Sequence, residues 1–148
     1  MGFTESIRTV LKQKYATFSG RASRSEYWWF SLFYTLVLAA LFISGLVIRM
    51  IAGTGEAFSL AYLIVMIPAA IFMLALIIPF IALQVRRFHD RNLSGWWYLL
   101  LMVLSAIPYV GFLASIASLV ITILKGTDGP NKFGADPLRP AATAEVFA

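Results

Sequence analysis

The chain has 148 residues, of which 60% are hydrophobic and only 13% are charged, and its net charge is +5. A water-soluble core of this size could not hide so much apolar surface, so the composition excludes an ordinary soluble domain and predicts an integral membrane protein. The chain contains no cysteine, which excludes a disulfide framework, a thiolate zinc site and a cysteine nucleophile.

Two short segments carry all of the excess positive charge. Residues 1–27 have a net charge of +3 and residues 84–95 have +2, whereas the charges of the other residues cancel. Because both segments border long apolar runs, we expect them to face anionic lipid headgroups rather than nucleic acid. The positive-inside rule then places the N-terminus and residues 84–95 together on the cytoplasmic side of the membrane.

Residues 1–19 are predicted to form an amphipathic helix. Apolar side chains recur at spacings of three and four, whereas Arg8 and Lys12 fall on the other side. The helix is too polar to cross a bilayer, so we expect it to lie along the membrane surface, with packing against the protein's own loops as the alternative. The apolar positions are Phe3, Ile7, Val10, Leu11, Tyr15 and Phe18.

The first membrane segment is predicted at residues 27–49. Ser23 and Glu26 have the spacing of a capping box, so the helix should begin there. Residues 28–48 are 21 consecutive uncharged residues, which as a helix extend over roughly 31 Å and match the hydrocarbon thickness of a bilayer. The aromatic residues expected to anchor this segment at the interface are Tyr27, Trp28 and Trp29.

The second membrane segment is predicted at residues 57–84, after a short turn at residues 53–56. Residues 57–83 are 27 consecutive uncharged residues, which is long enough to cross a bilayer with some tilt. Pro68 and Pro79 should kink this helix.

The third apolar segment is predicted at residues 95–125, and its path has two solutions. Residues 96–124 are 29 uncharged residues. One helix would be roughly 43 Å long and would need strong tilt, whereas a hairpin broken at residues 108–111 would have limbs of roughly 20 Å, too short to cross. The sequence leaves open three or four membrane helices, and with them the side of the C-terminal tail. Ser94 is the expected N-cap, and Trp96 and Trp97 are expected interface anchors.

Polar side chains of the two basic segments form a candidate polar cluster. Asp90 lies three residues after Arg87 and four after Arg86, so it can pair within its own helix or with arginines of the N-terminal segment. A salt-bridge cluster is the simpler interpretation, and phosphate binding or acid–base chemistry is the alternative. No metal site is expected, because one histidine and one nearby carboxylate are too few ligands. The cluster comprises Arg21, Arg24, Glu26, Arg86, Arg87, His89 and Asp90.

Residues 126–137 form a candidate tail motif that is dense in turn-forming residues. The lysine at position 132 is followed by Phe133, so the pattern of a phosphate-binding loop is absent, and EF-hand spacing is absent too. We therefore expect ordered turns on the membrane face, no cofactor, and a flexible tail at residues 138–148. The tail-motif residues are Gly126, Thr127, Gly129, Asn131, Phe133, Gly134 and Asp136.

Three motifs in this order resemble a known family. They are residues 18–28 (FSGRASRSEYW), residues 86–90 (RRFHD) with 94–97 (SGWW), and residues 126–137. Over roughly residues 15–137 the chain is similar to the bacterial inner-membrane family named domain of unknown function 805 (DUF805). The resemblance implies a multi-pass protein of the bacterial cytoplasmic membrane and no established reaction. If the three motifs form one site, the tail shares the cytoplasmic face, which favours the hairpin.

The sequence thus predicts an all-α, multi-pass membrane protein with a single membrane domain at residues 1–137. The leading function is non-enzymatic: self-assembly, binding of a membrane partner, or lipid interaction, with small residues such as Ala39, Ala40 and Gly45 available for helix contacts. An enzyme acting on lipid headgroups would use His89 as proton carrier and Asp90 to orient it. A transporter or channel subunit normally needs ionisable residues within its spans, and the three uncharged runs have none.

Overall fold

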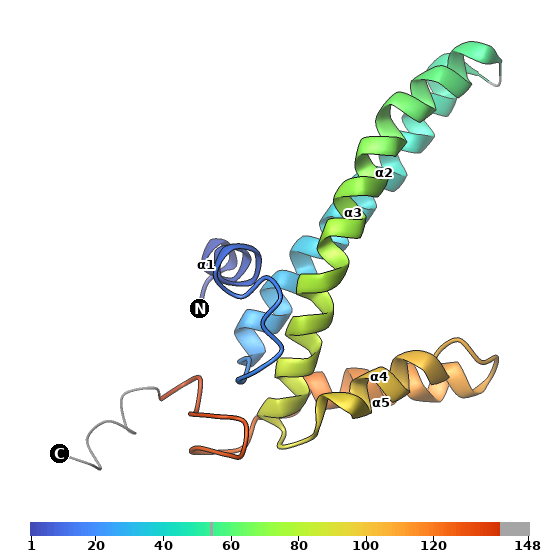
Figure 1. The fold of residues 1–148 in the computed structure, drawn as a ribbon. Coiled ribbons are helices and arrows are strands. Elements are labelled where there is room, and N and C mark those ends of the chain that lie inside the picture. The colour runs from blue at the N-terminus through green and yellow to red at the C-terminus, as the bar shows by residue number, and fades with distance from the viewer. Residues whose placement is uncertain (54, 140–148) are drawn as a thin grey trace.

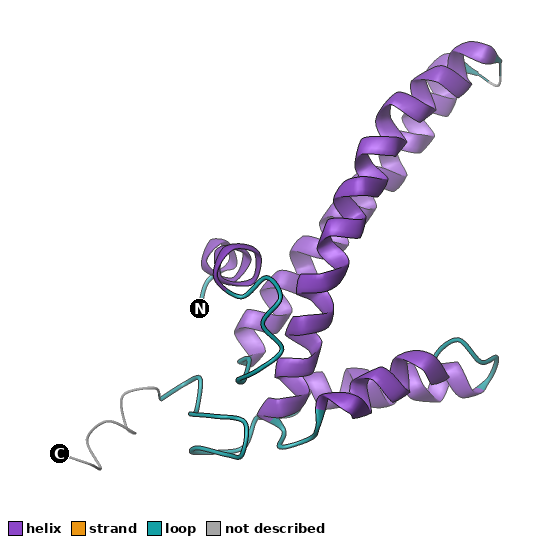
Figure 2. Ribbon diagram, viewed as in Figure 1, coloured by secondary structure: helices purple, strands orange, loops and turns teal. Residues whose placement is uncertain are grey.

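The computed structural model describes residues 1–53 and 55–139, and over these residues it is helical apart from turns, loops and one isolated β-bridge in the tail (Figure 2). This confirms the all-α prediction. Helices α2 and α3 form a long antiparallel hairpin, and α4 and α5 form a short one that leaves the base of α3 in a different direction (Figure 1). The elements are α1 (Phe3–Arg8), the π-helix η1 (Thr9–Gln13), α2 (Arg24–Ala52), α3 (Glu56–Asp90), α4 (Gly95–Leu104) and α5 (Val110–Ile123).

Helix α2 begins where the sequence predicts. Ser23 is its N-cap, and the Ser23 hydroxyl accepts a hydrogen bond of 3.2 Å from the backbone N–H of Glu26. The helix ends at Ala52 and is followed by Gly53, whose φ of +68° lies in the region that favours glycine. Its 29 residues correspond to about 43 Å, so α2 contains the whole predicted span.

Helix α3 runs unbroken through both of its prolines and has 35 residues. A proline has no backbone N–H, so it leaves the carbonyl four residues earlier without its helical donor. For Pro79 that carbonyl belongs to Ala75, and the hydroxyl of Tyr15 donates a hydrogen bond of 2.5 Å to it. The segment after η1 therefore contacts α3 at the point where the proline interrupts the helical hydrogen bonds.

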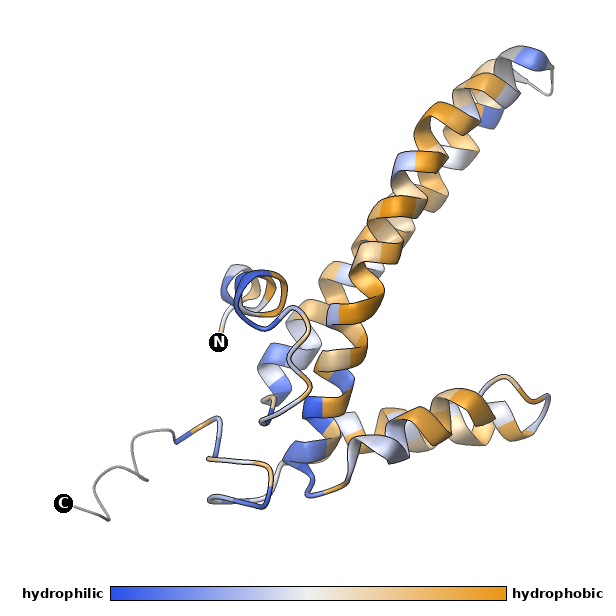
Figure 3. Cartoon of the chain, viewed as in Figure 1, coloured by the Kyte–Doolittle hydropathy of each residue, from blue (hydrophilic) through white to orange (hydrophobic). Residues whose placement is uncertain are grey.

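Helices α2 and α3 are both long and apolar enough to cross a membrane. In the most apolar 18-residue stretch of α2, 0% is buried inside the protein, and in that of α3 the share is 11%. Neither helix therefore has the environment of a soluble core. Large side chains point outward, with Phe42 70% exposed and Leu74 64% exposed. The hairpin is hydrophobic along most of its length, and hydrophilic residues gather at its two ends (Figure 3). Such a surface suits lipid rather than water.

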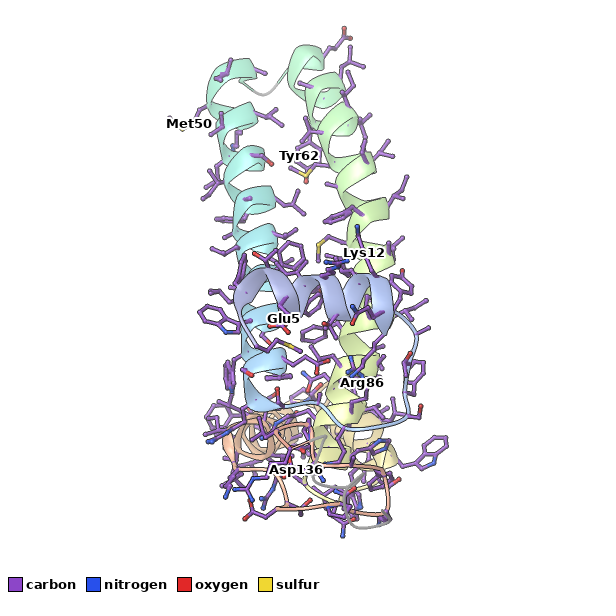
Figure 4. The ribbon with its side chains drawn as sticks, turned by 90° about the vertical axis from the view of Figure 1, so that its left-hand side faces the viewer. Glu5, Lys12, Met50, Tyr62, Arg86 and Asp136 are labelled. Atoms are coloured by element: carbon purple, nitrogen blue, oxygen red, sulfur yellow. The ribbon has the colours of Figure 1, made fainter. Side chains whose placement is uncertain are left out.

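Helices α1 and η1 form one short rod that lies across the α2–α3 hairpin (Figure 4). Their buried residues face the hairpin, and the hydroxyl of Ser6 donates a hydrogen bond of 2.6 Å to the carbonyl of Glu26. Glu5 and Lys12 are exposed. The rod ends at Gln13, so the helix predicted over residues 1–19 is too long. The chain leaves the helix at Lys14, before the loop that leads to the base of α2.

The third apolar segment forms two helices, and the single long helix is not formed. A turn at residues 105–109 separates α4 from α5, and Tyr109 within it has a φ of +64°. The chain can return so closely because residue 111 is glycine, where a Cβ atom would overlap the backbone of Ser105. At the other end of α4, the hydroxyl of Ser94 accepts a hydrogen bond from the N–H of Trp96 at 3.4 Å, which confirms the predicted N-cap.

The packed interior lies at the base of α3. One group of buried residues joins α2, α3 and η1, and a second joins α3 and α4. Beyond the rod formed by α1 and η1, the α2–α3 hairpin extends away from the other described elements, so the base is where segments distant in sequence can meet (Figure 1). The first group is Val10, Ala22, Tyr27, Phe30 and Leu83, and the second is Val85, Phe88 and Tyr98.

Candidate functional site

Charged side chains from separate parts of the chain meet at the base of α3. The Nη2 atom of Arg21 lies 2.8 Å from Oδ1 of Asp90, and Arg87 pairs with Oδ2 of the same carboxylate. The Nη1 atom of Arg86 lies 2.5 Å from Oε1 of Glu26. None of these side chains is more than 4% exposed. Figure 4 shows Arg86 at this level, below the α1 rod. We call these five residues the ion-pair cluster.

Three arginines face two carboxylates in the ion-pair cluster, so backbone carbonyl groups must stabilise the remaining positive charge. Arg87 donates hydrogen bonds to the carbonyls of Thr122, at 3.1 Å, and Leu124. These carbonyls lie at the C-terminal end of α5, where helical partners are missing and the helix dipole is negative. A third bond of 3.3 Å goes to the carbonyl of Ala22. Arg87 therefore connects the loop before α2, helix α3 and helix α5 through one side chain.

Arg21 makes the corresponding connection to the C-terminal tail. Besides its ion pair with Asp90, its guanidinium donates to the carbonyls of Thr127, at 2.5 Å, and Gly129, at 2.6 Å. A guanidinium group has five donors in a fixed planar arrangement, which allows one arginine to bind several acceptors at once. Arg21 of the first motif thus contacts both the second motif, at Asp90, and the third motif directly.

The tail motif also closes the C-terminal end of α3. The backbone N–H of Thr127 donates to the carbonyl of Asp90 at 2.8 Å, and Nδ2 of Asn131 donates to the carbonyl of His89 at 3.0 Å. Both carbonyls lie in the last turn of α3, where helical donors are missing. Residue 126 must be glycine at this approach, because a Cβ atom on Gly126 would overlap the Asp90 carboxylate.

His89 is held by the tail and the loop before α2. Its ring stacks on Phe133 with the centroids 3.9 Å apart and the planes 2° from parallel, and Nδ1 lies 3.1 Å from the carbonyl oxygen of Gly20. Both carboxylate oxygens of Asp90 bind arginines, so this arrangement does not place Asp90 to orient His89 for proton transfer. The geometry gives both residues a positioning role in the fold.

The rest of the tail motif forms ordered turns. Asn131 and Gly134 form an antiparallel bridge with two hydrogen bonds of 3.0 Å, and Gly134 has a φ of +136°. Asp136 is buried and accepts hydrogen bonds from the backbone N–H groups of Gly129, at 3.3 Å, and Leu138, at 2.9 Å. Leu138 belongs to this ordered turn, whereas residues 140–148 of the predicted flexible tail lie outside the described residues.

A pocket of about 220 Å³ opens beside the ion-pair cluster. The first turn of α2 and the start of the tail line it. Arg24 on its wall is exposed and makes no ion pair with another described residue, unlike the arginines of the ion-pair cluster. The exposed Lys125 pairs with Asp128, with Nζ 2.8 Å from Oδ1. The hydrogen bond from Lys125 and its charge lower the pKa of the Asp128 carboxyl group.

Four of the five predicted interface anchors are exposed, two near the start of α2 and two in the first turn of α4. They are Trp28, Trp29, Trp96 and Trp97, with exposed fractions of 41%, 40%, 76% and 55%. The fifth, Tyr27, is only 7% exposed because its face of α2 packs inward. Its hydroxyl accepts a hydrogen bond of 3.0 Å from Nε2 of Gln84 on α3.

Sequence reasoning missed several groups that complete the site. The carbonyls of Gly20 and Thr122 bind His89 and Arg87, and a backbone carbonyl has no signature in the sequence. Gln84 does have a signature in the sequence, because it is an amide that directly follows the predicted apolar run of residues 57–83. A lone amide at the end of a predicted span signals an inward-facing position.

The comparisons with known proteins agree with these motifs. Residues 15–135 match the family described as "Protein of unknown function (DUF805)". The chain is 40% identical to the inner membrane protein YhaI of Escherichia coli (strain K12) over 129 residues, which cover 87% of this chain and 92% of YhaI. It is 37% identical to the inner membrane protein YhaH of the same strain over 131 residues, covering 86% and 92%. No solved structure matches the chain. The chain therefore belongs to the DUF805 family and is an integral membrane protein.

Proposed function

We propose that the protein is a non-enzymatic membrane protein that binds anionic phospholipid headgroups at a basic cytoplasmic face. The observation that carries this proposal is the exposed Arg24 on the wall of the pocket beside the ion-pair cluster, which we call the headgroup pocket. Arg24 lies four residues before the exposed Trp28 on the same helix. Tryptophan favours the level of the lipid headgroups, so a charge in the first turn of α2 lies within reach of a phosphate.

Arg24 is the side chain of the headgroup pocket that is available to an anion. The lining has three cationic side chains and three carboxylates, but each carboxylate is engaged: Asp90 with Arg21, Asp128 with Lys125, and Asp136 with backbone N–H groups. Arg24 lies in the first turn of the 29-residue helix α2, where the positive end of the helix dipole adds to its attraction for an anion. The ion-pair cluster behind it has one more arginine than carboxylate. Arg21 and Arg87 bind Asp90 and backbone carbonyl groups, and Arg86 binds Glu26, so these side chains hold the base in shape while the exposed Arg24 contacts lipid.

The proposed topology has the N-terminus in the cytoplasm, α2 and α3 across the bilayer, and the α4–α5 hairpin within the cytoplasmic leaflet. Helices of 10 and 14 residues extend over about 15 and 21 Å, less than the roughly 30 Å hydrocarbon core. Both ends of the hairpin connect to the base of α3, through Ser94 and through the contact of Leu124 with Arg87. A hairpin tethered at both ends returns to the face from which it entered.

Short-chain lipids test this function directly. Purified full-length protein in a neutral detergent is titrated with dihexanoyl phosphatidylglycerol or dihexanoyl phosphatidylcholine, and the unfolding temperature is followed by tryptophan fluorescence. We expect the anionic lipid alone to raise the unfolding temperature, and Arg24→Gln to lose most of the rise. Arg49→Gln, at the other end of α2, is the matched control. Equal shifts with both lipids, or an unchanged shift in Arg24→Gln, contradict the proposal.

A further inference from the structure

A second pocket of about 300 Å³ lies where Tyr27 and the base of α3 meet the α4–α5 hairpin. We propose that this pocket, which we call the hydroxyl pocket, binds the hydroxyl-bearing head of a neutral amphiphile. It shares no lining residue with the headgroup pocket. Its polar lining residues are all uncharged, and they are Tyr27, Gln84, Tyr98, Ser105, Ser115 and Ser118.

The amide group of Gln84 defines what the ligand must provide. Gln84 is only 6% exposed, and its Nε2 atom donates to the hydroxyl oxygen of Tyr27 at 3.0 Å. Its Oε1 atom is buried and has no hydrogen-bond partner among the described residues. A buried amide oxygen without a donor is costly, and it is costlier still beside apolar helices. A ligand that donates an O–H group to this oxygen removes that cost.

The tyrosine hydroxyls complete a site for a group that both donates and accepts. The Tyr27 oxygen already accepts the Gln84 hydrogen bond, so its own proton is free to point elsewhere. Tyr98 lines the same pocket from α4 and is 8% exposed. A hydroxyl group can donate to Gln84 and accept from a tyrosine at once, which an ether or an ester carbonyl cannot do.

Size and charge narrow the class of ligand further. A water molecule occupies about 30 Å³, so a single bridging water would leave most of the pocket empty. The lining contains no charged side chain, so a charged ligand would lose its hydration without gaining a counter-ion. Met102 and Leu119 also line the pocket and are 41% and 49% exposed, so an apolar chain attached to the head can lie against the hairpin.

Two probes test the proposal, and they differ only in whether the oxygen atom carries a proton or a methyl group. The full-length protein in phosphatidylcholine nanodiscs is equilibrated with 4-octylphenol or 4-octylanisole, and uptake is corrected with protein-free nanodiscs. The phenol both donates and accepts, whereas the methyl ether only accepts. We expect the phenol to bind about tenfold more tightly than the anisole, as expected for one hydrogen bond to a buried unsatisfied group. Equal binding of the two probes, or no specific binding of either, overturns the proposal.

Three variants test whether the probes bind in the hydroxyl pocket. Gln84→Met keeps the length of the side chain but removes the amide, so the preference for the phenol should disappear. Ser118→Leu fills the pocket without touching the amide and should weaken both probes. Ser44→Ala on α2, whose hydroxyl bonds only the carbonyl of Leu41, is the control and should retain the preference. Circular dichroism checks that each variant folds, and if Gln84→Met does not, unchanged binding in Ser118→Leu is sufficient to reject the site.

Discussion

The hydroxyl group of Tyr15 donates a hydrogen bond to the carbonyl oxygen of Ala75, 2.5 Å away. Sixty positions of the chain separate the two residues. The carbonyl is available because Pro79 lacks the N–H that would otherwise bind it. A proline within an apolar helix thus creates an acceptor, and a tyrosine from the N-terminal segment satisfies it, which joins the α1 rod to α3.

This relationship predicts a non-additive pair of substitutions. Tyr15→Phe should lower the free energy of unfolding by about 1 kcal/mol, the usual net value of one hydrogen bond. In a Pro79→Ala background the same change should cost less, because residue 79 then supplies a backbone donor to Ala75. The measurement is denaturant unfolding of all four proteins in micelles. An equal cost of Tyr15→Phe in both backgrounds would mean that the proline does not create this contact.

Asp90 should be the most sensitive residue of the ion-pair cluster. Asp90→Asn leaves Arg21 and Arg87 without their shared buried carboxylate, and we expect a loss of about 3–5 kcal/mol in the free energy of unfolding. Asp128→Asn is the matched control, because it breaks an exposed pair with Lys125 and should leave stability unchanged within error. Similar losses in the two variants would show that burial of the cluster is not what stabilises the base.

Features with a local signature could be predicted from the sequence. Ser23 with Glu26 and Ser94 before Trp96 mark helix starts by side-chain spacing alone. The pairing of Arg87 with Asp90 follows from helical geometry in the same way. The long uncharged runs likewise located α2 and most of α3, because charge is excluded from lipid-facing helices.

Features that depend on tertiary contacts could not be predicted. Arg86 could reach Asp90 along its own helix, yet it pairs with Glu26 of α2, a choice made by the packing of two helices. Tyr27 is a residue type that favours the membrane interface, yet it faces inward because of the packing of α2 against α3. The length of the third apolar segment does not decide between a strongly tilted helix and a hairpin, and only the resemblance of the three motifs to the family favoured the hairpin.

Gly126 offers a test of how the tail is held. Gly126→Ala places a methyl group against the Asp90 carboxylate, so residues 127–136 should separate from the end of α3. Hydrogen exchange at Thr127 and Gly134 should become several-fold faster, because their N–H groups lose the arrangement that protects them. Gly2→Ala is the control, since a Cβ atom there meets nothing within 4 Å. Unchanged exchange in the Gly126→Ala protein would show that the tail tolerates the displacement.

We expect the fold to require the flat ring of His89 and not its ability to bind a proton. His89→Phe preserves a flat ring against Phe133, whereas His89→Ala removes the stacked pair, which is worth about 1 kcal/mol. Hydrogen exchange of residues 127–136 should therefore stay slow in His89→Phe and accelerate in His89→Ala. If both substitutions release the tail equally, the hydrogen-bonding nitrogen near Gly20 is the important group instead.

The proposed topology predicts which side of the membrane each loop faces, and cysteine labelling can test this. The chain has no cysteine, so a single introduced cysteine reports its own compartment. Lys12→Cys and Asp128→Cys, both exposed, should react with a membrane-impermeant maleimide only after the inner membrane is opened. Gly55→Cys, at the turn between α2 and α3, should react in intact spheroplasts. The unsubstituted chain is the control for background labelling. The contacts of Arg21 with both Asp90 and Thr127 require the tail and the N-terminal segment to share one face, so labelling of Asp128→Cys together with Gly55→Cys would be incompatible with the proposed topology.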